Sequence, residues 1–125
     1  MRLRCAIIED LRPDAQVLER ALLAASAHSC RLQCTLYASG NEFLRRGALS
    51  EQDVIFLDIC MPGLDGIETA RYLRGEDPRI PIVFVTSSEE YVWDALPLHP
   101  FDYLRKPYDD ARVRKLLDDL LAALG

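Results

Sequence analysis

Residues 54–58 read VIFLD, four apolar residues closed by the carboxylate of Asp58. An unbroken apolar run of this length is typical of a central strand that is covered on both faces of a parallel sheet. A carboxylate at the end of a buried strand is costly to place there without a partner. The segment therefore predicts a parallel sheet with a polar site at the carboxyl end of this strand.

Three other apolar runs end in the same way. Residues 5–8 lead into Glu9 and Asp10, residues 82–85 into Thr86, and residues 101–105 into Lys106. Ligands of an open parallel sheet bind beyond the carboxyl ends of its strands, where the strand order reverses. Three carboxylates converging on one edge indicate a divalent cation, and the lysine and threonine are suited to a phosphoryl group.

The whole chain alternates between strand-like and helix-like segments, which predicts an α/β fold. We expect a flavodoxin-like (βα)5 doubly wound parallel sheet with strand order 2-1-3-4-5. Ser39 and Ser88 are expected to cap helices, residues 75–78 to end the third helix, and Pro97 to end the fourth. The expected strands are 3–9, 31–37, 54–59, 81–86 and 101–105, and the expected helices are 13–25, 39–47, 66–74, 88–96 and 113–124.

Composition narrows the class of protein. The chain has 125 residues, half of them hydrophobic, and we expect one domain over 1–125 with no linker. No apolar run approaches the roughly 20 residues that span a membrane, and the start lacks the shape of a signal peptide, so we expect a cytoplasmic protein. The net charge of −5 without a basic stripe argues against direct nucleic-acid binding. Cys5 and Cys34 are expected to be reduced core residues.

The strand order places Glu9 and Asp10 beside Asp58. Three carboxylates in one place raise one another's proton affinity, and a bound Mg²⁺ reverses this effect because it favours every ionised form. Taken singly, each residue has an ordinary structural explanation: a turn or helix start for the carboxylates, a strand end for Thr86, a surface position for Lys106. Their common edge is what favours the functional interpretation.

Over its whole length the chain resembles the receiver domain of two-component response regulators. The resemblance is carried by residues 7–10 (IIED), 56–66 (FLDICMPGLDG), 85–88 (VTSS) and 102–107 (DYLRKP). Residues 91–95 (YVWDA), together with FDYLRKP over 101–107, further resemble the receivers of LytTR-type transcription factors.

The resemblance implies a role for each matching residue. Asp58 would accept a phosphoryl group from a histidine kinase, and Lys106 and Thr86 would contact that group. Tyr103 would change rotamer in response, and the bond between Lys106 and Pro107 would be cis. The implied Mg²⁺ ligands are Glu9, Asp10, Asp58 and the backbone carbonyl of Cys60.

The implied output is a changed surface of the fourth helix, fifth strand and fifth helix, which could also form a homodimer. In LytTR-type regulators a DNA-binding domain would follow, so the chain is either an excised receiver or one that stands alone. Tyr91 and Trp93 are interpreted as partly buried packing residues or as partner contacts. The charges of the last helix are either a solvated face or cross-subunit ion pairs.

Two other classes of function remain to be compared with this one. The first is a receiver-shaped interaction module that is never phosphorylated, which would have no need to retain Glu9, Asp10, Asp58 and Lys106 together. The second is a flavodoxin-like enzyme that binds a nucleotide or flavin. The chain has no glycine-rich phosphate-binding motif, and its first strand–helix loop is acidic, so this class ranks last.

Overall fold

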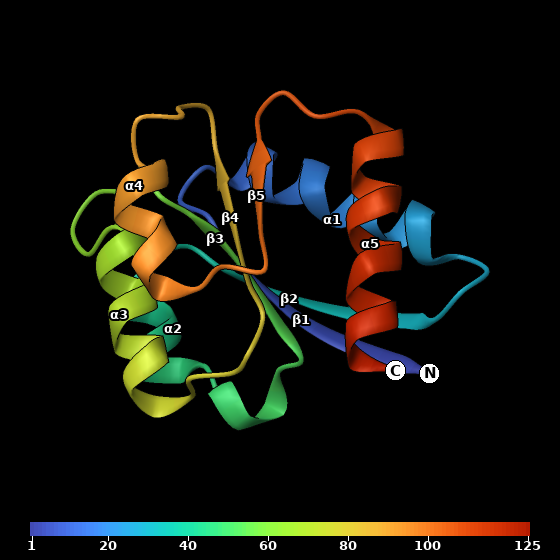
Figure 1. Ribbon diagram of the computed structural model, residues 1–125, viewed down its shortest axis with the longest axis horizontal. Coiled ribbons are helices and arrows are strands. Elements are labelled where there is room, and N and C mark those ends of the chain that lie inside the picture. The colour runs from blue at the N-terminus through green and yellow to red at the C-terminus, as the bar shows by residue number, and fades with distance from the viewer.

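The computed structural model describes all residues 1–125 as a five-stranded sheet with helices on both faces (Figure 1). All strand pairs are parallel, and the strand order is β2-β1-β3-β4-β5, so the predicted fold class is confirmed. The strands are β1 (Arg2–Ile8), β2 (Arg31–Tyr37), β3 (Val54–Asp58), β4 (Ile82–Thr86) and β5 (Asp102–Arg105). The helices are α1 (Arg12–Ser26), α2 (Gly40–Arg46), α3 (Gly66–Glu76), α4 (Val92–Ala95) and α5 (Asp110–Leu124), with single 3₁₀ turns at Leu49–Glu51 and Leu96–Leu98.

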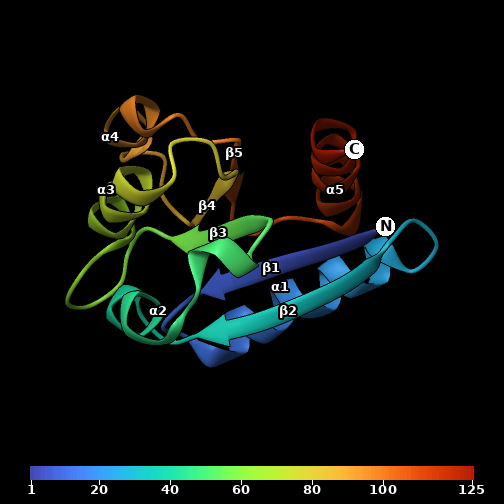
Figure 2. The ribbon, with the colours of Figure 1, turned by 90° about the horizontal axis from the view of Figure 1, so that it is seen from below.

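The two faces of the sheet carry separate apolar cores. Helices α1 and α5 cover one face, while α2, α3 and α4 cover the other (Figure 1 and Figure 2). Every residue of β3 is buried, as expected for a central strand between two helical layers. No helix is both long and apolar enough to cross a membrane. The four cysteines are free thiols, and Cys5 in β1 lies next to Cys34 in β2, with 2.9 Å between the sulfur atoms.

Local sequence explains where most helices begin. The side chains of Ser39, Asp65 and Asp109 each accept a hydrogen bond from a backbone N–H in the first turn of α2, α3 and α5. Such caps satisfy donors that have no partner within the helix. Pro13 lies in the first turn of α1, where its missing N–H costs nothing. The predicted cap at Ser39 is therefore confirmed.

The fourth helix departs from the prediction. It begins at Val92 without a side-chain cap, and Ser88 instead accepts a hydrogen bond from the N–H of Glu90 within a loop. The prediction that Ser88 caps the helix was wrong because residues 87–91 form a loop and Tyr91 is the N-cap residue. The helix ends at Ala95, and Pro97 lies in the 3₁₀ turn that follows, so the expected effect of this proline is confirmed.

The third helix ends within residues 75–78, as predicted. Helix α3 continues through Gly75 to Glu76, two residues beyond its expected last residue, and Asp77 is its C-cap. Of the two roles considered for Trp93, partly buried packing is wrong, because this residue is 80% exposed and the single turn of α4 packs on the core through Ala95. A partner contact by Trp93 stays a prediction. Tyr91 is partly buried against the same core, as predicted. The bond between Lys106 and Pro107 is cis.

Two arginines make most of the side-chain hydrogen bonds at the amino end of the sheet. Arg4 in β1 donates its backbone N–H to Asp53 at 2.7 Å, and its guanidinium donates twice more to the same carboxylate, just before β3. Arg74 near the end of α3 donates to four backbone carbonyl oxygens. Those acceptors are Asp77, Ile80, Leu98 and His99.

Candidate functional site

Three carboxylates meet at the carboxyl end of the sheet. Glu9 and Asp10 follow β1, and Asp58 is the last residue of the neighbouring strand β3. One ligand oxygen from each lies within 4.8 Å of the other two. Glu9 and Asp58 are only 6% and 5% exposed, so their charges are poorly hydrated. The sequence prediction that these three residues converge is confirmed.

Burial and mutual repulsion disfavour the ionised forms of Glu9 and Asp10. Burial raises the pKa of Glu9, and the nearby Asp58 raises it further, while Lys106 opposes the shift without cancelling it. Burial and the neighbouring Glu9 also raise the pKa of Asp10. One carboxylate oxygen of Asp10, Oδ1, is buried without any hydrogen-bond partner. An unpaired buried oxygen among crowded carboxylates is what a hard divalent cation satisfies, so this donor set fits Mg²⁺.

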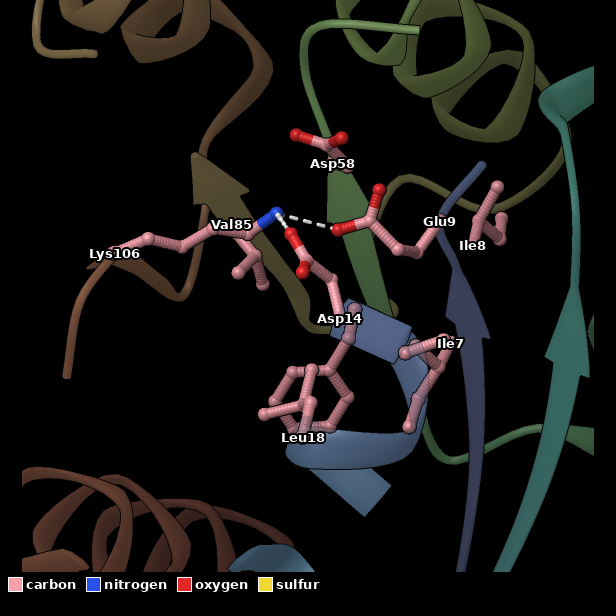
Figure 3. A pocket seen from close by; sticks show the side chains of 10 residues that line it. Ile7, Ile8, Glu9, Asp14, Leu18, Asp58, Val85 and Lys106 are labelled. Carbon is pink, nitrogen blue, oxygen red and sulfur yellow. Dashed lines mark hydrogen bonds and ion pairs between the residues drawn. The ribbon is translucent and has the colours of Figure 1, made fainter. Parts of the chain in front are cut away.

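Lys106 follows β5 and reaches across the end of β4 into the cluster. Its ammonium donates to Glu9 Oε1 at 2.5 Å and to Asp14 Oδ2 at 2.8 Å (Figure 3). Burial alone would lower the pKa of Lys106, but the hydrogen bonds to Asp14 and Glu9 raise it more, so the net pKa lies above its ordinary value. The lysine is therefore a fixed positive charge beside Asp58.

Asp14 is the site residue that sequence reasoning missed. It lies in the first turn of α1, which starts four positions after Ile8, in a segment that was predicted only as a helix. The available signal was the acidic side chain one turn beyond Asp10 on the helix that leads away from the site. The pattern could not show that this side chain turns back toward a lysine 92 positions later in the chain.

Thr86 and Tyr103 are connected through the backbone of Ser88. The hydroxyl oxygen of Thr86, at the end of β4, accepts the N–H of Ser88 at 3.3 Å. The hydroxyl of Tyr103 in β5 donates to the carbonyl oxygen of Ser88 at 2.6 Å. Thr86 is 1% exposed and also contacts the sulfur of Cys60 at 4.0 Å. A movement of the Thr86 side chain would therefore be felt at Tyr103 through one residue of the β4–α4 loop.

The loop after β3 is shaped by close backbone approach. The N–H of Cys60 donates to Asp58 Oδ1 at 3.4 Å, so this loop already directs a donor at the carboxylate. Gly66, the first residue of α3, donates to the carbonyl oxygen of Ile59. A β-carbon at Gly66 would collide with the backbone of Asp58 and Ile59. Only glycine lets α3 begin this close to the site.

A pocket opens beside the cluster on the α1 side. It has a volume of about 360 Å³ and is lined by Asp14, Val17, Ser87, Lys106, Pro107 and Tyr108. Asp14 and Lys106 also line a much smaller cavity that includes Glu9 and Asp58. The pair thus lies between the buried carboxylates and the open surface.

Comparison with known proteins identifies the family. Residues 6–118 match the family described as response regulator receiver domain. The chain belongs to this family. Receivers are phosphoacceptor signalling modules of two-component systems rather than classical enzymes, and the acidic cluster of Glu9, Asp10 and Asp58 is consistent with a phosphoacceptor site.

Individual relatives agree with the family. The DNA-binding transcriptional regulator NtrC of Klebsiella pneumoniae is 34% identical over 114 residues, which cover 90% of this chain and 23% of NtrC. The sensory transduction protein LytT of Oceanobacillus iheyensis is 33% identical over 127 residues, covering 100% of this chain and 50% of LytT. The chain thus spans half or less of the length of these relatives.

A solved structure supports the same assignment. The response regulatory domain of protein mrkE from Klebsiella pneumoniae has a TM-score of 0.84 and is 30% identical, with 97% of each chain covered. The predicted resemblance to response regulator receivers, LytTR-type receivers included, is therefore confirmed.

Proposed function

We propose that Asp58 accepts a phosphoryl group from the phosphohistidine of a histidine kinase in a Mg²⁺-dependent reaction. Receivers pair with histidine kinases as a family. The observation that carries the proposal is the convergence of Glu9, Asp10 and Asp58, with an unpaired buried oxygen on Asp10.

The same residues would hold the cation. Oxygens of Glu9, Asp10 and Asp58 and the backbone carbonyl of Cys60 are the proposed Mg²⁺ ligands, with water completing the shell. Bound Mg²⁺ would neutralise negative charge on the phosphoryl oxygens and on the carboxylates. The raised pKa values of Glu9 and Asp10 support this assignment because they show how poorly the protein alone compensates the charge.

The transfer itself needs positioning more than covalent chemistry from the protein. A carboxylate oxygen of Asp58 attacks phosphorus in line, and the new O–P bond forms as the N–P bond of phosphohistidine breaks. The electron pair of the broken bond stays on the imidazole nitrogen, which takes up a proton from solvent. The Cys60 N–H, 3.4 Å from Asp58 Oδ1, is directed at the attacking group. Lys106 supplies a permanent positive charge in addition to that of the cation.

Phosphorylation would switch the protein through Thr86 and Tyr103. A phosphoryl group on Asp58 offers strong acceptor oxygens, and the Thr86 hydroxyl, now accepting from the N–H of Ser88, would turn to donate to them. Ser88 would then lose one of its two tethers, which frees the hydroxyl of Tyr103 to leave its carbonyl oxygen. The result is a population shift in the surface of α4, β5 and α5.

The output of this switch is a separate proposal. The α4–β5–α5 surface could pair two copies of the chain, and Trp93, 80% exposed on α4, is available there for a contact. NtrC is named as a DNA-binding transcriptional regulator, and this chain matches only 23% of it. We propose by analogy that this receiver controls transcription through a DNA-binding region beyond residues 1–125.

Labelling with acetyl phosphate tests the central proposal. With Mg²⁺ present, intact mass should rise by one phosphoryl group, and Asp58→Asn should abolish the gain while circular dichroism shows an unchanged fold. Asp65→Asn is a matched control, because Asp65 caps α3 outside the cluster and its loss should leave labelling intact. A wild-type protein that gains no mass, or gains it equally without Asp58, would favour a receiver-like interaction module that is never phosphorylated.

A further inference from the structure

Lys106 is held away from Asp58 by a carboxylate that lies outside the acidic cluster. Its two hydrogen bonds go to Glu9 and Asp14, and it makes none to Asp58. Figure 3 shows Asp14 and Asp58 on opposite sides of the lysine ammonium. The side chain of Asp14 makes no other hydrogen bond and is 39% exposed, so its only polar partner is this lysine.

Contact with a phosphoryl group on Asp58 requires the ammonium to move toward that residue. The movement strengthens the interaction with Asp58 and lengthens the one with Asp14, because the two carboxylates lie on opposite sides. An interaction that is stronger in the starting state than in the reacting state slows a reaction. The 2.8 Å ion pair is therefore a cost that phosphorylation has to overcome.

We propose that Asp14 is a positioning residue that retains Lys106 in the unphosphorylated protein and thereby restrains phosphorylation of Asp58. The inference rests on the proposed function and adds a regulatory role for a residue of α1. Since Asp14 also lines the outer pocket of about 360 Å³, whatever fills that pocket reaches the carboxylate directly. A partner that draws Asp14 away would release the lysine at the moment of transfer.

Initial labelling rates of Asp14→Asn test this inference at saturating Mg²⁺. The variant should be labelled roughly two- to fivefold faster than wild type, the range expected for a partly exposed ion pair. Asp14→Glu, which restores a carboxylate, should move the rate back toward that of wild type. Asp118→Asn removes the same charge from an exposed position of α5 and should leave the rate unchanged. Asp14→Ser replaces Asp14→Asn if circular dichroism shows that the latter is poorly folded.

Two donors separate the restraint from simple repulsion of an anionic reactant. Acetyl phosphate carries more negative charge than phosphoramidate, so a repulsive Asp14 would slow the former selectively. The proposal requires a similar acceleration with both donors. Equal rates in wild type and variant, a slower variant, or acceleration with acetyl phosphate alone would each overturn it. A wild-type protein that is not labelled at Asp58 at all would instead contradict the proposed function.

Discussion

The two ends of the sheet place charged groups in opposite ways. At the amino end, Arg4 and Asp53 satisfy each other with three hydrogen bonds, and Arg74 donates to four carbonyl oxygens. At the carboxyl end, only one of the three clustered carboxylates, that of Glu9, pairs with the lysine of the site, and an oxygen of Asp10 has no partner. The first arrangement is complete without a ligand, and the second is complete only with one. Unsatisfied charge therefore distinguishes the functional edge from the structural edge.

Arg74→Met should cause the largest loss of stability if the amino end is structural. The variant keeps the apolar stem but leaves the buried carbonyl oxygen of Ile80 and that of Leu98 without their donors at 2.6 and 2.7 Å. We expect the free energy of unfolding to fall by about 2–4 kcal/mol. Urea denaturation measures it, with Arg71→Met on the exposed face of α3 as the control. A loss no greater than that of the control would show that these bonds contribute little.

Asp53→Asn should have the next largest effect on stability. The amide has only one acceptor oxygen and no negative charge, so it cannot replace both bonds from the Arg4 guanidinium, whose Nε and Nη2 now lie 3.2 Å from the carboxylate oxygens. We expect a loss of about 1–2 kcal/mol, since both side chains are partly buried. Asp119→Asn, which breaks an exposed pair with Lys115, should cost less than about 0.5 kcal/mol. Equal losses in the two variants would show that the partly buried Arg4–Asp53 pair contributes no more stability than the exposed Lys115–Asp119 pair.

Asp10→Asn should act in the opposite direction at the functional end. Removing one charge relieves repulsion with Glu9, so without Mg²⁺ the protein should gain about 0.5–1 kcal/mol. The rise in thermal midpoint that Mg²⁺ gives the wild type by mass action should shrink or vanish. Thermal unfolding with and without Mg²⁺ measures both. A destabilised variant that still responds fully to Mg²⁺ would contradict the assigned cation site.

Much of this contrast could be predicted from the sequence because strand ends are local signals. Apolar runs that stop at Glu9, Asp58, Thr86 and Lys106 were enough to place the site residues on one edge, since parallel strands all end there. The strand bounds agree with the structure to within a residue at each end.

The contacts that were missed depend on directions that no local pattern encodes. Asp14 turns back toward Lys106, and Arg74 reaches carbonyl oxygens up to 25 positions away. Ser88 was predicted to cap a helix with its hydroxyl, whereas its backbone N–H and carbonyl oxygen connect Thr86 with Tyr103. The packing role considered for Trp93 was wrong because a helix of four residues has no complete apolar face to bury.

The pH dependence of stability gives the smallest and most selective test. Burial acts to raise the pKa of Asp53, but hydrogen bonds from Arg4 outweigh it, so the folded pKa lies below the ordinary aspartate value of 3.8. The stability that this carboxylate contributes is therefore full above pH 3.8 and is lost as pH falls through the lower folded pKa. Urea midpoints of wild type and Asp53→Asn should differ at neutral pH and converge below that range.

The same titration of Asp10→Asn without Mg²⁺ should give a difference of opposite sign. The folded pKa of Asp10 is raised, so its ionised form destabilises the protein above that pKa, and the penalty disappears as the carboxyl is protonated. The gain in stability of the variant should thus fade as pH falls, and it should begin to fade at a higher pH than the loss in Asp53→Asn. Parallel curves of the same sign would mean that the two ends of the sheet do not differ electrostatically. Curves of opposite sign would show that the ionised carboxylate is destabilising at the carboxyl end of the sheet, where a cation and a phosphoryl group can bind, and stabilising at the amino end.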